Sequence, residues 1–215
     1  LDPVDSLKGL APLLGAPRDP DFAAAVAERI ADKSKKLEAV IPELVRYTNG
    51  MIIWAHPQAQ VNVIGCPSMA SIIGVMLPAI YNPNLVSEES GRGFSEAEAR
   101  ATAMAADLVG YDPQQSGGLF TFGGTGTLLY GLKIGLEKCI PDVFHKGLRS
   151  DAYVVASQQG HYGALNAAGW LGIGQDNVIK VESSADNAIK LDALEAALRD
   201  LLSSGTRIAA IVATM

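Results

Sequence analysis

The second half of the chain alternates short apolar runs with longer amphipathic segments. Short apolar runs are typical of buried parallel strands, and apolar residues at a spacing of three or four indicate helices. The pattern predicts strands over 119–122, 152–156, 178–181 and 207–213, and helices over 127–139, 161–171 and 191–202. Such alternation predicts an α/β fold, with a mostly parallel sheet flanked by helices.

The amino-terminal part has helical periodicity but few apolar residues per turn. Its first 20 residues are rich in Pro, Gly and Asp, which favours irregular structure. Asp19-Pro20-Asp21 is typical of a helix start and predicts a helix over 22–39. A second short helix is expected to follow Pro42 and to end near Asn49-Gly50.

Three further elements are expected before the alternating pattern begins. Residues 68–81 are almost entirely apolar and predict a mostly buried helix, whereas the polar residues 87–93 predict a loop. Ser95 and Glu98 have the spacing of a capping box, so a helix is expected from Ser95 to about residue 109.

Two parts of the chain are therefore expected to differ in role. Residues 1–55 form an N-terminal helical arm that contacts a second subunit in a dimer. Residues 56–215 form the first part of a large α/β domain. Because the last apolar run ends at the ligand-binding edge expected of a parallel sheet, we expect this domain to be incomplete in the chain.

The composition is that of a globular protein and narrows the range of partners. Of 215 residues, 48% are hydrophobic and 19% charged, and 17 basic against 23 acidic residues leave a net charge of −6. This balance disfavours nucleic acid, which requires a basic surface. Residues 69–81, interrupted by Pro78, are too short to cross a bilayer, so no membrane association is expected. Cys66 and Cys139 have no spacing for a disulfide framework or a metal site, which favours the cytoplasm.

The strongest local motif is Gly123-Gly124-Thr125-Gly126-Thr127, between a predicted strand and a predicted helix. Glycines allow an anion to approach the backbone, and the first amides of a helix point toward it, so the motif predicts a phosphate cradle. A tight turn capped by threonine is the structural alternative. A dinucleotide loop of an oxidoreductase is a further alternative, although Leu129 stands where that motif has its third glycine.

His161-Tyr162 is the second candidate, directly after a predicted strand and at the start of a predicted helix. An imidazole at this edge of the sheet is suited to stack on a flat ligand ring or to act as a general acid or base. A capping or packing role is the alternative for a single histidine at a helix start.

Together these motifs resemble those of the group II pyridoxal-phosphate-dependent amino-acid decarboxylases, a family that includes glutamate, aromatic amino-acid and diaminobutyrate decarboxylases. The resemblance covers about residues 50–215 and is to the amino-terminal half of the family only. It is carried by His56-Pro57, the 123–127 motif, residues 153–157 leading to His161-Tyr162, Asn166-Ala167-Ala168, Leu171-Gly172, Leu191-Asp192 and Ile211-Val212-Ala213-Thr214.

The resemblance implies a type I aminotransferase-like fold, a dimer and the cofactor pyridoxal 5'-phosphate (PLP). Gly126 and Thr127 would hold the cofactor phosphate with Thr125 close by, and His161 would be the catalytic residue that stacks on the pyridine ring. His56 and Asn62 would contact the amino-acid substrate.

In this family the Schiff-base lysine and the aspartate that pairs with the pyridine nitrogen come later in the sequence. We therefore expect a carboxyl-terminal half or a second polypeptide to supply them, in a homo- or heterodimer, and we expect this chain alone to be inactive. Two other functions remain open: a PLP-dependent aldehyde-lyase that cleaves a carbon–carbon bond, and a non-catalytic partner subunit.

Overall fold

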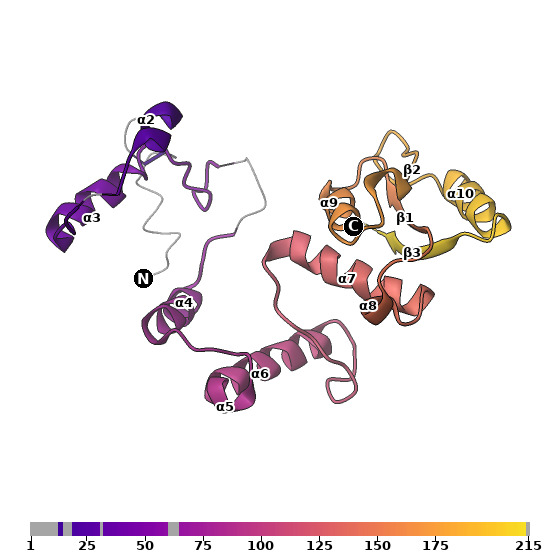
Figure 1. The fold of residues 1–215 in the computed structure, drawn as a ribbon, viewed down its shortest axis with the longest axis horizontal. Coiled ribbons are helices and arrows are strands. Elements are labelled where there is room, and N and C mark those ends of the chain that lie inside the picture. Colours follow the sequence, from indigo (N-terminus) through magenta and orange to yellow (C-terminus); the bar gives the residue numbers. More distant parts are fainter. Residues whose placement is uncertain (1–12, 15–18, 31, 60–64, 214–215) are drawn as a thin grey trace. The chain divides into compact units, whose positions relative to one another are not determined.

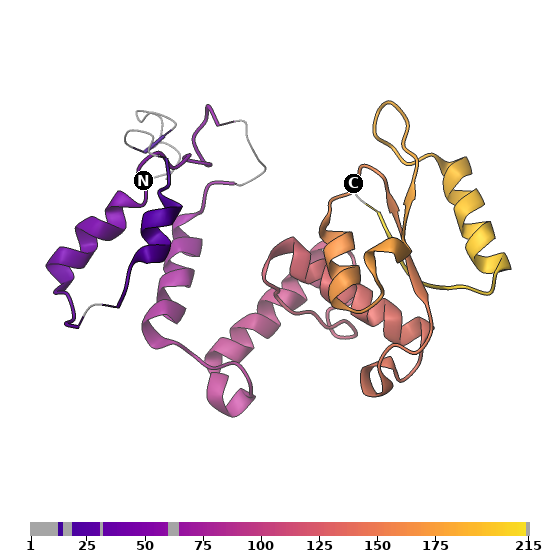
Figure 2. The same cartoon turned by 45° about the horizontal axis from the view of Figure 1, so that its top comes forward.

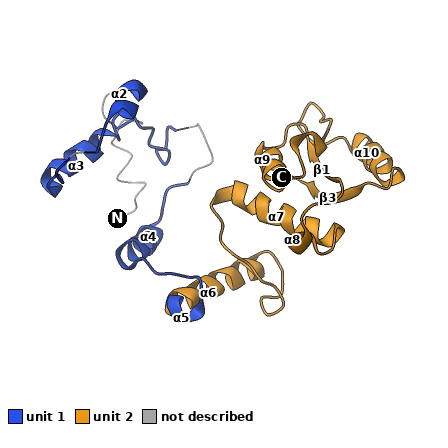
Figure 3. Cartoon of the chain, in the orientation of Figure 1, with its two compact units in different colours: residues 1–91 blue, residues 92–215 orange. Residues whose placement is uncertain are grey.

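A computed structural model describes residues 13–14, 19–30, 32–59 and 65–213. The chain divides into two compact units, residues 1–91 and residues 92–215, shown in different colours in Figure 3. The two units are defined by which residues pack together. The predicted boundary at residue 55 instead separates a dimer-contacting arm from the α/β domain, and it stays a prediction.

The first unit contains four helices among its described residues (Figure 1). They are α2 (Phe22–Ala27), α3 (Leu37–Arg46), α4 (Met69–Tyr81) and α5 (Glu88–Gly91). α5 lies within the segment predicted to be a loop, so that prediction is wrong over four residues. The predicted start of α2 is confirmed, because the Asp21 carboxylate caps the helix by accepting a hydrogen bond of 2.9 Å from the Ala24 N–H.

The predicted helix over 22–39 is wrong beyond Ala27. Val26 is 78% exposed and Ile30 is fully exposed, so no packing holds further turns in place, and short helices without tertiary contacts are marginal. The guanidinium of Arg29 donates to the carbonyl oxygens of Val26 and Ala27 at the end of α2. These bonds satisfy carbonyls that a longer helix would have used.

The break predicted at Pro42 is also absent, since Pro42 lies inside α3. Apolar residues continue through the proline at positions 37, 40, 41, 44 and 45, which is the spacing of one helix face. Helical periodicity therefore outweighs the single backbone hydrogen bond that proline removes.

The apolar helix α4 begins where predicted, and the Ser68 hydroxyl caps it by accepting the Ser71 N–H at 3.1 Å. The prediction that it is mostly buried is wrong, because α4 buries none of its residues among those described. Ile73 is 53% exposed and Val75 is 71% exposed.

The second unit has the predicted α/β alternation (Figures 1 and 2). Its elements are α6 (Gly93–Leu108), α7 (Gly123–Cys139), α8 (Val143–Lys146), β1 (Ala152–Ser157), α9 (Gly163–Trp170), the 3₁₀ turn η1 (Gln175–Asn177), β2 (Val178–Val181), α10 (Leu191–Ser203) and β3 (Arg207–Val212). Three of the four predicted strands are confirmed.

Two helix starts differ from those predicted. α6 begins at Gly93, and the Ser95 N–H already donates to the Arg92 carbonyl, so Ser95 and Glu98 do not form the predicted capping box. α7 begins at Gly123, four residues earlier than predicted, because the glycine motif itself forms the first turn of the helix.

The strand predicted over 119–122 is not formed within the described part of the chain. The sheet there consists of β1, β2 and β3, and residues 119–122 pair with none of them. An apolar run indicates a preference for burial, but a strand also needs a neighbouring backbone to pair with.

The sheet has the order β2-β1-β3 and both pairings are parallel. Central β1 is buried on both faces, as expected for a parallel strand, and Val154 and Val155 are fully buried. The crossovers β1–α9–β2 and β2–α10–β3 run in opposite directions across the sheet. Right-handed crossovers then place α9 and α10 on opposite faces, as Figures 1 and 2 show.

α7 covers the same face of the sheet as α9 and packs against both α9 and β3. Its buried residues Leu132 and Leu136 belong to the main core, together with residues of β1, α9, β2 and β3. The position of α7 is therefore set by the sheet, and α7 in turn positions the glycine motif at its amino-terminal end.

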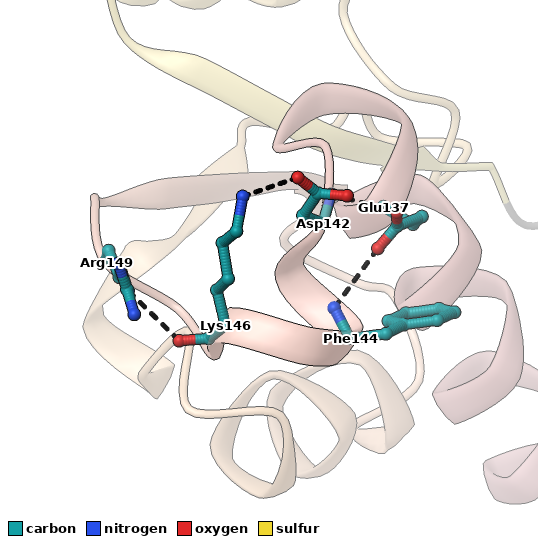
Figure 4. Close-up of polar contacts among 5 residues, drawn as sticks. All are labelled: Glu137, Asp142, Phe144, Lys146 and Arg149. Carbon is teal, nitrogen blue, oxygen red and sulfur yellow. Dashed lines mark hydrogen bonds and ion pairs between the residues drawn. The ribbon is translucent and has the colours of Figure 1, made fainter.

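The carboxyl-terminal end of α7 is joined to α8 by a polar corner (Figure 4). The Glu137 carboxylate accepts hydrogen bonds from the backbone N–H groups of Asp142, at 3.0 Å, and Phe144, at 3.2 Å. Lys146 pairs with Asp142 at 2.6 Å, and Lys133 lies over the Phe144 ring at 4.8 Å. These contacts fix the carboxyl-terminal end of α7, whereas the glycine motif lies at its amino-terminal end.

Across the described ranges, no helix has both the length and the apolar character needed to span a membrane.

Candidate functional site

The glycine motif forms the first turn of α7. Gly123 has a positive φ of 76°, which glycine adopts without strain, and its N–H donates to the Thr121 carbonyl at 2.8 Å. The N–H groups of the next two residues, Gly124 and Thr125, have no acceptor within the helix. They stand at the positive end of a 17-residue helix dipole, which is a favourable place for an anion.

The threonines of the motif differ in their surroundings. The Thr127 hydroxyl lies 2.9 Å from the Thr121 hydroxyl, which in turn donates to the Gly123 carbonyl at 2.9 Å. These bonds hold the turn together. Among the described residues the Thr125 hydroxyl makes no hydrogen bond, and Thr125 is half-buried. Thr125 is thus the threonine of the motif whose hydroxyl is open to a ligand.

Gly126 is buried beneath this turn. A Cβ at Gly126 would lie 3.0 Å from the Cβ of Thr121, so the turn packs closely only without a side chain at this position. Its N–H falls within the helical hydrogen-bond ladder. Sequence reasoning missed the Gly124 amide, although counting the four free N–H groups at the helix start would have found it.

His161 lies between the end of β1 and the start of α9, and it is exposed. Its Nδ1 accepts a hydrogen bond of 3.0 Å from the Gly163 N–H. The Tyr162 ring lies with its centroid 4.1 Å from the imidazole centroid, at an interplanar angle of 30°. Tyr162 therefore covers one face of the imidazole, with the two ring planes tilted against each other.

The structure brings the glycine motif and His161 onto neighbouring helices of the same unit. α7 and α9 pack together, with the Phe122 and Trp170 rings 6.5 Å apart. Leu128, one residue beyond the motif, lies against Gly163, two residues beyond His161.

A cavity of about 480 Å³ lies at the carboxyl ends of β1 and β3. Open α/β sheets bind ligands at this edge. Its wall includes Gly160, the residue before His161, and the loop 186–189, which sequence reasoning also missed. The loop's run of Ser, Asp and Asn is a turn signal that could have drawn attention to it. The other residues that line the cavity include Ser157, Gln159, Leu194 and Ile211.

The loop is organised around the Asp186 carboxylate. This carboxylate accepts hydrogen bonds from the Ser184 hydroxyl and from the Ala188 N–H, the latter at 3.4 Å. The bond from Ser184, followed by that from the backbone, holds the pKa of Asp186 below its usual value.

The two predicted substrate residues belong to the first unit. His56 is buried, with 5% of its surface exposed, and its Nδ1 accepts the Gln58 N–H at 3.1 Å. Asn62 lies outside the described residues. Contact of His56 and Asn62 with a substrate stays a prediction.

Two of the lysines in the second unit are engaged in local contacts. Lys133 lies over Phe144 and Lys190 pairs with Glu182. Where the structure describes the chain, no three His, Cys, Asp or Glu side chains gather as a set of metal ligands.

Comparison with known proteins gives a consistent set of relatives. No family model matches the chain. A glutamate decarboxylase-like protein of Gibberella zeae is 25% identical over 161 residues, which are 74% of this chain and 31% of that protein. An L-2,4-diaminobutyrate decarboxylase of Rhizobium meliloti is 27% identical over 164 residues, 76% of this chain and 32% of that protein. The chain thus spans about a third of the length of these relatives.

Solved structures share the fold over a larger part of the chain. Mouse CSAD superposes with a TM-score of 0.78 at 17% identity, over 90% of this chain and 42% of that one. A glutamate decarboxylase domain from Vibrio parahaemolyticus gives a TM-score of 0.77 at 22% identity, over 90% of this chain and 45% of that one. The rice protein TDC, solved with PLP and tryptamine, gives a TM-score of 0.74 at 17% identity, over 92% of this chain and 43% of that one.

These similarities confirm the resemblance to the group II decarboxylases and the predicted type I fold. The chain is α/β, with a parallel three-stranded sheet flanked by helices, and it corresponds to part of each of these longer proteins.

Proposed function

We propose that this chain contributes the cofactor-phosphate and ring-binding part of a PLP-dependent amino-acid decarboxylase. The observation that carries the proposal is the packing of α7, which begins with the glycine motif, against α9, which begins two residues after His161. Relatives named as decarboxylases support the reaction class.

The first turn of α7 fits a phosphate group in its chemistry. The Gly124 and Thr125 N–H groups donate to the phosphate oxygens, and the Thr125 hydroxyl adds a third donor. Gly126 and Thr127 keep the turn in shape, Gly126 by its lack of a side chain and Thr127 through Thr121. Of the three predicted phosphate residues, Thr125 then donates directly, whereas Gly126 and Thr127 build the turn.

His161 is the residue that we assign to the cofactor ring. Tyr162 covers one face of the imidazole, so the other face is the one available for stacking. When bound, PLP supplies an electron sink for the pair of electrons left as the carboxyl group departs. His161 keeps the ring oriented, and the cavity beside Gly160 provides room for an amino-acid side chain.

The remaining parts of the site belong to the same proposal. The Schiff-base lysine and the aspartate for the pyridine nitrogen come from outside these 215 residues, on a carboxyl-terminal half or a second chain. The short share of the relatives' length that the chain spans supports this. The proposal also includes a dimer contact through residues 1–55 and a cytoplasmic location. The free thiols of Cys66 and Cys139 support the cytoplasmic location.

The decarboxylase is tested by reducing the isolated protein with borohydride and measuring the intact mass of every polypeptide present. Borohydride fixes a Schiff base, so a pyridoxyl mass marks the chain with the lysine. We expect that mass outside these 215 residues, together with PLP-dependent release of CO₂ from one of a panel of amino acids. A pyridoxyl mass on a lysine of this segment contradicts the proposed division of the site.

Two variants of His161 make the test specific to this segment. His161→Phe keeps an aromatic ring and is expected to retain most of the PLP affinity, whereas His161→Ala loses roughly 2- to 10-fold, as expected for a lost stacking contact. Protein that binds no PLP in any form rules the proposal out. Carbon–carbon cleavage without CO₂ release identifies the aldehyde-lyase instead, and a nicotinamide or flavin spectrum identifies the oxidoreductase. PLP binding without turnover in the full assembly identifies the non-catalytic partner.

A further inference from the structure

Gly163 is a buried residue at the start of α9, two residues after His161. A Cβ at this position would lie 2.9 Å from Nδ1 of His161 and 2.8 Å from Cδ1 of Leu128. Side-chain carbons in proteins essentially never approach other heavy atoms so closely. Any side chain at residue 163 must therefore displace the imidazole, the leucine or both.

The backbone of Gly163 also contacts the imidazole directly. Its N–H donates to Nδ1 of His161 at 3.0 Å. A ring nitrogen that accepts a hydrogen bond carries no proton, so in the neutral imidazole the proton is on Nε2. One residue thus determines both the tautomer and the space in which the ring lies.

The geometry points to Gly163 as a positioning residue for His161: its N–H and its missing side chain together hold the imidazole in one orientation, with Nε2 as the proton-bearing nitrogen. Tyr162 supports the same orientation from one face. The consequence for cofactor binding rests on the proposed function, whereas the effect on the imidazole does not.

A second glycine of α9 provides the matched comparison. A Cβ at Gly169 would meet the nearest atom, Nε2 of Gln175, at 3.6 Å, which is an ordinary contact. Gly169→Ala is therefore expected to fit in the last turn of α9 and to leave stability unchanged or slightly higher. The steric restriction at Gly163 is thus not a general property of glycines in this helix.

The test is ¹⁵N NMR of the full chain without cofactor, in wild type, Gly163→Ala and Gly169→Ala. We expect a coupling across the hydrogen bond between the Gly163 amide nitrogen and His161 Nδ1, together with the Nε2–H tautomer, in wild type and in Gly169→Ala. Gly163→Ala is expected to lose the coupling and to show the mixed tautomers of a free imidazole. PLP titrations of the same samples are expected to show roughly 2- to 10-fold weaker binding in Gly163→Ala only.

A double variant separates the effect on His161 from the effect on packing. Leu128→Ala in the Gly163→Ala background removes the contact with Leu128 and leaves the one with Nδ1. If Gly163→Ala does not fold, the double variant is expected to fold and still to lack the coupling.

The inference is overturned if Gly163→Ala, or the double variant where only that one folds, keeps the coupling and the tautomer of wild type. If neither variant folds, the inference is overturned as well, because residue 163 then acts on the fold rather than on His161. If the imidazole changes as expected but wild type binds no PLP, the proposed function fails and the inference about His161 stands.

Discussion

Gly135 of α7 lies directly against the backbone of Ala209 in β3. A Cβ at Gly135 would stand 2.1 Å from the Ala209 carbonyl oxygen, so this is where the helix approaches the sheet too closely for any side chain. Because the glycine motif is at the amino-terminal end of the same helix, this contact also helps to set where the motif lies.

Gly135→Ala is expected to destabilise the protein by about 2–3 kcal/mol, the upper part of the range for overpacking, because the obstructing atom belongs to the backbone. Gly131→Ala in the same helix is the control, since its Cβ would meet nothing within 4 Å, and it is expected to be neutral or stabilising. Urea unfolding of both variants measures the difference. Equal stabilities would mean that α7 does not rest on β3 at Gly135.

The two threonines of the motif are expected to respond differently to loss of their hydroxyl groups. Thr125→Val removes a hydroxyl that is open to a ligand and is expected to weaken PLP binding about 10- to 100-fold, with little effect on stability. Thr127→Val breaks the contact with Thr121 and is expected to lower stability by about 1 kcal/mol. PLP titration and urea unfolding of each variant provide the two readouts. A stability loss in Thr125→Val larger than in Thr127→Val contradicts this assignment.

The loop that lines the cavity is expected to depend on pH through Asp186. Since its pKa is lowered in the folded state, its contribution to stability is complete above the ordinary carboxyl pKa of 3.8 and is lost as the pH falls below that value. Ser184→Ala removes the main cause, so the pKa of Asp186 is expected to rise toward 3.8. A ¹³C NMR titration of the Asp186 carboxyl group measures the change. Ser203→Ala, whose hydroxyl donates instead to the Asp200 carbonyl, is expected to leave this titration unchanged.

The corner between α7 and α8 is expected to depend on Glu137 more than on the ion pair beside it. Glu137→Gln leaves one acceptor oxygen for two N–H donors, so a loss of about 1 kcal/mol is expected, comparable to the loss of a helix cap. Lys146→Ala breaks a pair whose side chains are both 56% exposed and is expected to cost at most about 0.5 kcal/mol. Thermal unfolding of both variants ranks them, and the reverse order would show that the ion pair holds the corner.

Much of the second unit follows from the sequence alone. β1, β2, β3 and α10 lie within a residue or so of their predicted bounds, because each is specified by an apolar pattern within its own segment. The glycine motif and His161 were also singled out as candidates from local signals, one by its glycines and the other by its place after a strand. Both signals depend on residues that are close together in the sequence.

Only the tertiary structure decided where these local elements end and what they contact. Residues 119–122 have the composition of a strand but no neighbouring backbone, and α4 has the composition of a buried helix but remains exposed. The roles of Gly135 and Gly163 depend on atoms of Ala209 and Leu128, each of which belongs to another element. Periodicity reports what a segment prefers to bury, whereas close packing depends on which distant segment meets it, and that is settled only when the chain folds.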